Sequence, residues 1–114
     1  MICRLSIAGA FIVALAAPAT APAQDAEKGK QVYESAAPKC KMCHSVAGVG
    51  NAKGSLDEAG KLPAADLKAW IRTPKEMTAK AKAARKPPMP AYGKEKISDA
   101  DLDALVAYLS TLKK

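Results

Sequence analysis

The 114 residues leave room for one small domain and exclude a large core or a second domain of similar size. The 18 lysines and arginines outnumber the 11 acidic residues and give a net charge of +7, which favours an acidic protein, an anionic lipid surface or nucleic acid as a partner. One tryptophan and one phenylalanine supply little large apolar surface for a core.

Residues 1–23 have the pattern of a secretory signal. Arg4 precedes an apolar run over residues 5–17 that is too short to span a bilayer, and Ala21-Pro22-Ala23 matches an Ala-x-Ala cleavage site. We therefore expect a cleaved signal over 1–23, a single domain over 24–114 and a periplasmic location. An uncleaved anchor is the alternative. Export makes nucleic acid an unsuitable partner, and Cys3 would leave with the signal.

The first helix of the exported part is predicted over residues 25–35, with Asp25 as its N-cap. Ala26, Gly29, Val32 and Tyr33 recur at helical spacing. Because a glycine inside a helix costs about 0.5–1 kcal/mol relative to alanine, Gly29 suggests a close backbone contact with another helix.

The run Cys40-Lys41-Met42-Cys43-His44 matches the pattern for covalent attachment of a haem. Cysteines at i and i+3 place two sulfurs on one side of a turn, spaced for the two vinyl groups of a porphyrin, and His44 then stands where its imidazole can bind the iron. We expect one haem c, attached through Cys40 and Cys43. Such a macrocycle would also supply the apolar surface that the chain lacks.

Other uses of these residues fit the sequence less well. A structural zinc site needs four nitrogen or sulfur ligands, and outside the motif the sequence has no other histidine and only Cys3 as a further thiol. A thioredoxin-like pair needs a βαβ pattern, which the sequence does not have. A disulfide between Cys40 and Cys43 would close too small a loop to add much stability and would leave His44 without a role.

Two further helical segments are predicted in the middle of the chain. The first follows Pro63, carries Leu67, Trp70 and Ile71 on one face, and ends at Thr73-Pro74. The second runs from residue 75 to about residue 84, where lysine and alanine dominate, and we expect it to be exposed.

The second axial ligand of the iron is predicted among the methionines. Met42 lies within the attachment turn, too constrained to reach the opposite face. Met89 is the preferred candidate because Pro88 and Pro90 hold the backbone extended and reduce the cost of ordering the site. Met77 in the lysine- and alanine-rich segment is an alternative, as is an open or lysine-bound site.

The last helix has the clearest local signature. Ser98-Asp99-Ala100-Asp101 forms a capping box, and Ile97 and Leu102 are placed as a hydrophobic staple. An apolar stripe then continues to Leu112, and Lys113-Lys114 are expected to end the helix with the charge that its dipole favours. No strand is predicted. The expected fold class is therefore all-α, a small helical domain wrapped around one covalently bound haem.

These motifs resemble those of the class I (monohaem) cytochromes c. The resemblance covers nearly all of residues 24–114 and rests on Gly29-x-x-x-Tyr33, Cys40-x-x-Cys43-His44, Met89-Pro90 and the segment 102–109 of the last helix. It implies that the first and last helices cross near Gly29 and Tyr33 and that Met89 is the distal ligand. It also implies that Trp70 lies near the haem and donates its indole N–H to a propionate, although an ordinary core tryptophan is the alternative.

The chain departs from the family pattern at the partner of the proximal histidine. Relatives have a Gly-Pro step whose backbone carbonyl orients the imidazole, and the corresponding stretch here reads Gly54-Ser55-Leu56. The carbonyl of Ser55 can accept the same bond from His44 but lacks the stiffness of a proline, so the sequence leaves the partner of His44 Nδ1 open. A second departure is a longer link over residues 34–39.

The function predicted from these observations is that of a soluble, exported, monomeric carrier of single electrons and not an enzyme. The expected partners are redox proteins with an acidic docking surface, and no stable membrane insertion is expected after signal cleavage. Five lysines are expected to surround the haem edge: Lys39, Lys41, Lys86, Lys94 and Lys96. The alternatives are a tightly bound haem subunit of an exported dehydrogenase or oxidase, and a ligand-binding or peroxidase-like haem protein with a labile sixth ligand.

Overall fold

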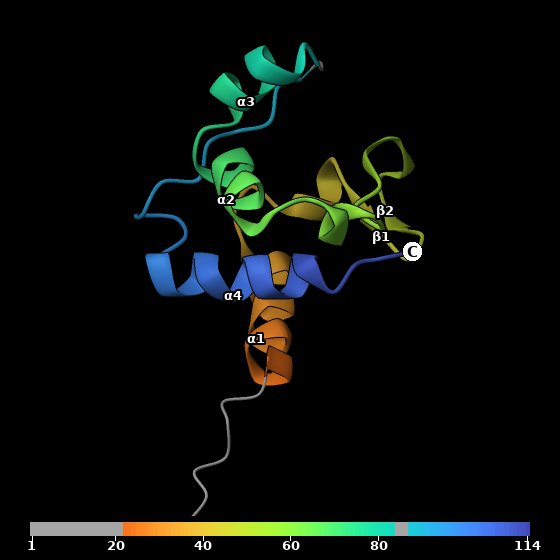
Figure 1. Cartoon of the computed structure of the whole chain (residues 1–114), viewed down its shortest axis with the longest axis vertical. Helices are drawn as coiled ribbons and strands as arrows, with labels where there is room; N and C mark the ends of the chain where they lie inside the picture. Colours follow the sequence, from red (N-terminus) through yellow and green to blue (C-terminus); the bar gives the residue numbers. More distant parts are fainter. Residues whose placement is uncertain (1–21, 84–86) are drawn as a thin grey trace, which may run out of the picture.

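Helix α1, Pro22–Ser35, and helix α4, Asp99–Ser110, cross each other at the base of the molecule (Figure 1). The computed structural model describes residues 22–83 and 87–114. The two helices touch at Gly29, where an added Cβ would lie 1.9 Å from the carbonyl oxygen of Ala104. The close backbone contact predicted at Gly29 is therefore confirmed, and one turn later the rings of Tyr33 and Tyr108 pack with their centroids 5.9 Å apart.

The start of α1 differs from the prediction. The helix begins at Pro22, so Asp25 lies in its first turn and is not its N-cap. Proline suits a first helical turn because its missing N–H would have no partner there. Residues 1–21 of the expected signal lie outside the described residues.

Helix α4 begins where its capping sequence predicts. The Ser98 hydroxyl accepts a hydrogen bond from the Asp101 backbone N–H at 3.2 Å, and both residues of the predicted staple, Ile97 and Leu102, are buried. The helix ends earlier than predicted, at Ser110. Lys113 and Lys114 consequently lie beyond its last turn, where the backbone N–H of Lys114 bonds to the carbonyl of Asp57.

Helix α2, Ala64–Arg72, packs on α4, and helix α3, Pro74–Ala81, follows it at the top of the view (Figure 1). Both confirm the predicted helical segments, and the break between them falls at Thr73. Leu67 and Ile71 form the buried face of α2. The lysines of α3 are exposed, as predicted.

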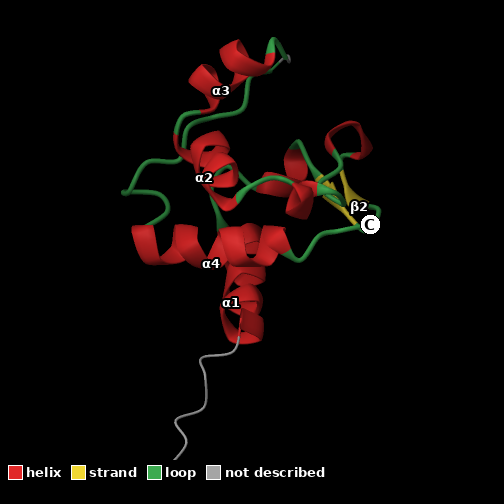
Figure 2. Cartoon of the chain, viewed as in Figure 1, coloured by secondary structure: helices red, strands yellow, loops and turns green. Residues whose placement is uncertain are grey.

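A small hairpin was not predicted. Strands β1, Ser45–Val46, and β2, Val49–Gly50, pair antiparallel, with Ser45 opposite Gly50 and Val46 opposite Val49 (Figure 2). Ala47 and Gly48 at its tip both have positive φ, the conformation that a two-residue hairpin loop requires. Ser55 then forms a parallel bridge with Ser45 and brings the chain back beside the attachment turn.

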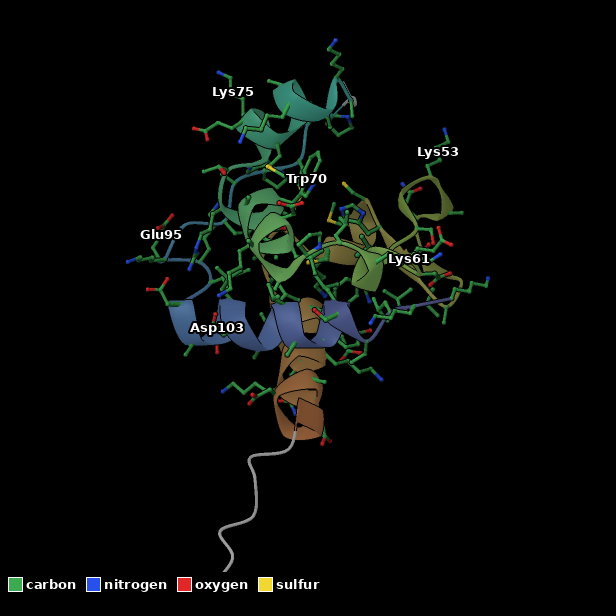
Figure 3. All side chains as sticks on the ribbon, in the orientation of Figure 1. Lys53, Lys61, Trp70, Lys75, Glu95 and Asp103 are labelled. Atoms are coloured by element: carbon green, nitrogen blue, oxygen red, sulfur yellow. The ribbon has the colours of Figure 1, made fainter. Side chains whose placement is uncertain are left out.

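The core lies between α1, α2, α4 and the segment that precedes α4. Its buried members are Val32, Tyr33, Ala36, Leu67, Ile71, Tyr92, Ile97, Leu102, Leu105, Val106 and Leu109. Charged side chains such as Lys61, Lys75 and Asp103 lie on the outside (Figure 3). None of the helices within residues 22–83 and 87–114 is both long and apolar enough to cross a membrane.

Candidate haem-binding site

The two cysteines of the motif lie on one short turn. A 3-10 turn, Cys40–Met42, is closed by hydrogen bonds from the backbone N–H groups of Cys43 and His44 to the carbonyl of Cys40, at 3.1 and 2.9 Å. Both cysteines are free thiols, Cys40 half-buried and Cys43 exposed. Burial raises the pKa of the Cys40 thiol, which keeps it neutral. The turn therefore offers two thiols three residues apart, followed directly by an imidazole.

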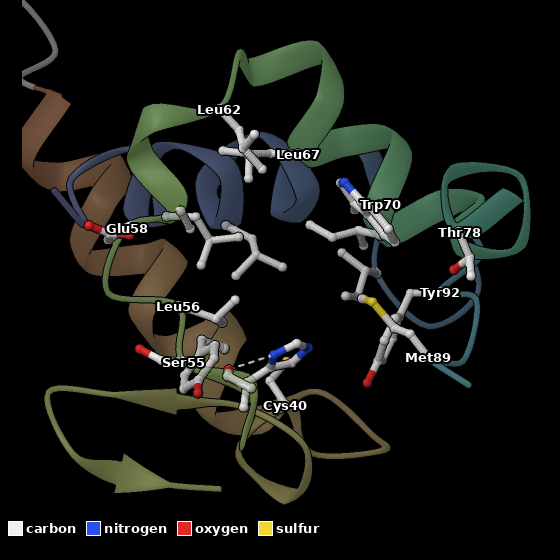
Figure 4. Close-up of a pocket in the computed structure, with 18 of the residues that line it drawn as sticks. Cys40, Ser55, Leu56, Glu58, Leu62, Leu67, Trp70, Thr78, Met89 and Tyr92 are labelled. Atoms are coloured by element: carbon white, nitrogen blue, oxygen red, sulfur yellow. Dashed lines mark hydrogen bonds between the residues drawn. The ribbon is translucent and has the colours of Figure 1, made fainter. Parts of the chain in front are cut away.

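The imidazole of His44 is oriented by the carbonyl of Gly54. Nδ1 of His44 lies 2.9 Å from that oxygen (Figure 4, dashed line). The acceptor is therefore Gly54 and not the candidate that the sequence offered, the carbonyl of Ser55 one residue later. Gly54 is needed because a Cβ there would lie 2.1 Å from the carbonyl oxygen of Cys43 and 3.0 Å from Nδ1 itself. With Nδ1 occupied as a donor, Nε2 is the nitrogen left to bind a metal.

A cavity of about 430 Å³ opens beside His44. Its walls are mostly aliphatic and aromatic and come from α2, α4, the segment 54–62 and the loops that flank Met89, with Tyr33 of α1 and Thr78 of α3 (Figure 4). The lining includes Cys40, His44, Trp70 and Met89, four of the five residues predicted for the site. Met77, the alternative ligand, is half-buried but does not line this cavity. Both the volume and the apolar lining are typical of sites for organic ligands.

Cys43, the fifth predicted residue, lines a smaller hollow of about 70 Å³ beside the turn. This hollow shares Cys40, His44 and Met89 with the larger cavity and adds the exposed side chain of Met42. The two spaces therefore meet at the attachment turn, and the smaller one lies toward the surface.

Two tyrosines that were not predicted to belong to the site border it. The hydroxyl of Tyr33 is buried, and among the described residues it has no hydrogen-bond partner. Burial, reinforced by the nearby Cys40 and Tyr108, raises the pKa of Tyr33 to about 12. Tyr92 also lines the cavity, and its hydroxyl donates to the carbonyl of Pro38. Burial is the main cause that raises the pKa of Tyr92 to about 12, and the nearby Cys40 adds to it. Both phenols therefore stay protonated and can act as hydrogen-bond donors.

The residues present fit a haem. The paired thiols can form thioethers, Nε2 of His44 can bind iron, and the apolar cavity can enclose a macrocycle. The hydroxyl of Tyr33, which has no partner among the described residues, adds a donor to the cavity wall. A buried polar group of this kind requires a hydrogen-bond partner. A small helical domain with such a site has the features of a c-type cytochrome.

The comparison with protein families gives the same assignment. The family model described as "Cytochrome C oxidase, cbb3-type, subunit III" matches residues 24–109, and the chain belongs to this family. Together with the relative described next, this match makes the protein a class I monohaem c-type cytochrome, a haem c protein of electron transport.

One curated relative is cytochrome c oxidase subunit 2 of Alkalihalophilus pseudofirmus, which is 38% identical over 98 residues. The match covers 77% of this chain and 26% of the relative, so the chain spans about a quarter of that protein's length. No solved structure matches the chain.

Proposed function

We propose that this chain is a soluble, exported carrier of single electrons, with Cys40 and Cys43 as haem tethers and His44 and Met89 as axial ligands. The observation that carries the proposal is the apolar cavity of about 430 Å³ whose lining includes His44, Met89 and Cys40. Bound haem would supply the one-electron couple of its iron. The chain's own residues orient that group, exclude water from it and set its potential.

Each proposed ligand has a distinct physical effect. The carbonyl of Gly54 fixes the ring of His44 and raises its basicity as a ligand. The thioether of Met89 favours ferrous iron and therefore raises the reduction potential. The apolar walls work in the same direction because a dry site disfavours the form with the higher charge. Trp70, half-buried in the cavity wall, is a candidate donor to a propionate.

Electrons would enter and leave beside the attachment turn. Met42 and Cys43 are exposed there and line the smaller hollow, so the tethered edge of the macrocycle would lie near the surface. Lys39 and Lys41 flank the turn and are exposed. Lys94 bonds to Asp99 at 3.3 Å and so offers less free charge, and Lys86 lies outside the described residues. An acidic redox protein is the partner that this surface favours.

A haem subunit that works within an oxidase is the second candidate. The observation in its favour is that the matching family and the curated relative are both named as oxidase subunits. Native mass spectrometry of the protein purified from its source separates the two. A free carrier gives one chain with one haem, whereas a bound subunit co-purifies with further chains.

Two single substitutions test the ligand assignment. Met89→Ala should lower the reduction potential and let carbon monoxide bind the reduced protein, because it removes the thioether and vacates a coordination position. Met77→Ala is the matched control and should do neither, since Met77 lies outside the cavity lining. If Met77→Ala had these two effects and Met89→Ala did not, Met77 would be the ligand. Carbon monoxide binding by the wild type would instead favour a ligand-binding haem protein.

Charge reversal tests the docking surface. Lys39→Glu and Lys41→Glu should slow electron transfer to an acidic redox partner. The wild-type rate should fall with added salt, because 0.1 M salt largely screens charges more than about 10 Å apart. Lys30→Glu makes the same charge change on the exposed face of α1 and serves as the control. Stopped-flow rates that ignore both ionic strength and these substitutions would contradict the proposed partner chemistry.

A further inference from the structure

Arg72 joins three segments of the chain at the end of α2. Its Nη1 donates to the backbone carbonyls of Tyr92 at 2.8 Å and of Ile97 at 2.6 Å, and its Nη2 lies 3.0 Å from a carboxylate oxygen of Asp99. The side chain is only 18% exposed. A charged group this far from water is costly to bury unless its donors are satisfied, and here two carbonyls and one carboxylate satisfy them.

The two carbonyls belong to the ends of one tight turn. The backbone N–H groups of Lys96 and Ile97 both bond to the carbonyl of Gly93, so residues 93–97 form a closed unit. By binding Tyr92 on one side of this turn and Ile97 on the other, Arg72 holds the turn against the end of α2. The carboxylate of Asp99 extends the same contact into the first turn of α4.

Tyr92 is the point where this contact reaches the cavity. Its backbone N–H donates to the carbonyl of Ile71 at 3.0 Å, its carbonyl accepts from Arg72, and its hydroxyl donates to the carbonyl of Pro38, just before the attachment turn. Only Pro90 and Ala91 separate it from Met89, a link of at most roughly 10 Å, in which the ring of Pro90 fixes one backbone angle. Whatever holds Tyr92 therefore limits where Met89 can move.

We propose that Arg72 is a positioning residue for the distal ligand. It holds Tyr92 and the 93–97 turn so that the sulfur of Met89 stays at the iron, and it thereby sets how often this ligand dissociates. The inference rests on the proposed role of Met89. It concerns a residue that touches neither the ligand nor the cavity, since Arg72 is not part of the cavity lining.

The shape of the guanidinium makes the role specific to arginine. A planar fork can donate to two carbonyls and a carboxylate at once, whereas a lysine ammonium is a point charge on a flexible stem. Arg72→Lys keeps the charge and loses this geometry, and Arg72→Met loses both. The expected order of ligand retention is therefore wild type, Arg72→Lys, Arg72→Met.

Lys68→Met provides a matched control. Lys68 lies on the same helix, and its ammonium pairs with the carboxylate of Asp103 on α4 at 2.7 Å. Removing it breaks an ion pair between α2 and α4, as removing Arg72 does, but leaves the bonds to Tyr92 and Ile97 in place. The control thus separates the loss of an α2–α4 ion pair from the loss of loop anchoring.

The test uses the haem-loaded protein and titrates the ferric form with imidazole, which competes with the methionine for the iron. Arg72→Met should bind imidazole at least about tenfold more tightly than the wild type, the effect of losing one charge-assisted hydrogen bond, and should weaken the far-red absorption band of sulfur-bound ferric haem. The imidazole affinity of Arg72→Lys should lie between those of Arg72→Met and the wild type. If Arg72→Met yields no holoprotein, Arg72→Lys alone is compared with the wild type. Lys68→Met should match the wild type.

The outcomes separate this inference from the assignment on which it rests. If Met89→Ala leaves the band unchanged, both the proposed ligand and the role of Arg72 are wrong. If Met89→Ala abolishes the band but the Arg72 variants bind imidazole as the wild type does, or no more tightly than Lys68→Met does, only the role of Arg72 is overturned. In a Met89→Ala background, Arg72→Lys should have no further effect on imidazole affinity, because no distal ligand is left to position.

Discussion

Gly29→Ala should destabilise the protein although alanine is the better helix former. A Cβ at position 29 would meet the carbonyl oxygen of Ala104 at 1.9 Å and the Cβ of Tyr108 at 2.7 Å, whereas ordinary contacts begin at 3.4 Å. The obstacles are backbone or are bonded directly to it, so no side chain can rotate away. The helices α1 and α4 would have to separate by roughly 1.5 Å at this point.

The net effect follows from two opposing terms. Overpacking a close contact costs about 1–3 kcal/mol, and an obstacle formed by backbone favours the upper end of that range. The helix propensity of alanine returns about 0.5–1 kcal/mol. We therefore expect the free energy of unfolding to fall by about 2 kcal/mol. Separation of the helices would also move Leu105 and Leu109 of α4, which line the cavity.

The assay is guanidinium unfolding of the haem-loaded protein, followed by far-ultraviolet circular dichroism and by haem absorbance. Gln31→Ala is the control, because Gln31 is exposed on the same helix and its replacement should change stability by less than about 0.5 kcal/mol. A Gly29→Ala protein as stable as the wild type, or more stable, would refute the argument that this crossing requires a glycine.

Three further predictions concern local contacts. Gly54→Ala should displace the carbonyl that orients His44 and shift the reduction potential in voltammetry, whereas Ser55→Ala leaves that carbonyl in place and should shift the potential less. Ser98→Ala should lower the free energy of unfolding by about 1 kcal/mol in thermal denaturation, through loss of the α4 cap. Lys94 is the main cause that lowers the pKa of Asp99, and Arg72 adds to it. This carboxylate therefore contributes stability above its ordinary pKa of 3.8, and that stability is lost as the pH falls. Urea unfolding across a pH series should therefore show Asp99→Asn less stable than the wild type at neutral pH and nearly equal to it in acid.

The sequence predicted those elements whose signals are local. Ser98 caps α4 through the backbone three residues ahead, and Leu67, Trp70 and Ile71 mark α2 by their spacing alone. The strands β1 and β2 were missed because two residues each are too few to show an alternation. The end of α4 was placed too late because Leu112 continues the apolar spacing beyond the last helical residue, Ser110.

The site shows the same division. Cys40, Cys43 and His44 are adjacent in the chain, so their chemistry could be predicted directly. The acceptor for His44 was left open because the bridge between Ser45 and Ser55, which determines the register, is a tertiary contact. The contacts of Arg72 could not be predicted, since two of its acceptors are backbone carbonyls 20 and 25 residues further along the chain. Every residue has a backbone carbonyl, so the sequence does not indicate which of them accepts a hydrogen bond.

The central claim is that Cys40 and Cys43 hold one haem by covalent bonds. The most direct measurement is the mass of the protein after denaturation and extraction with acid acetone, which removes haem that is only coordinated. We expect the wild-type chain to retain the mass of one haem and a Cys40→Ala, Cys43→Ala double variant to retain none. Extraction of the haem from the wild type, or covalent haem on the double variant, would contradict the account.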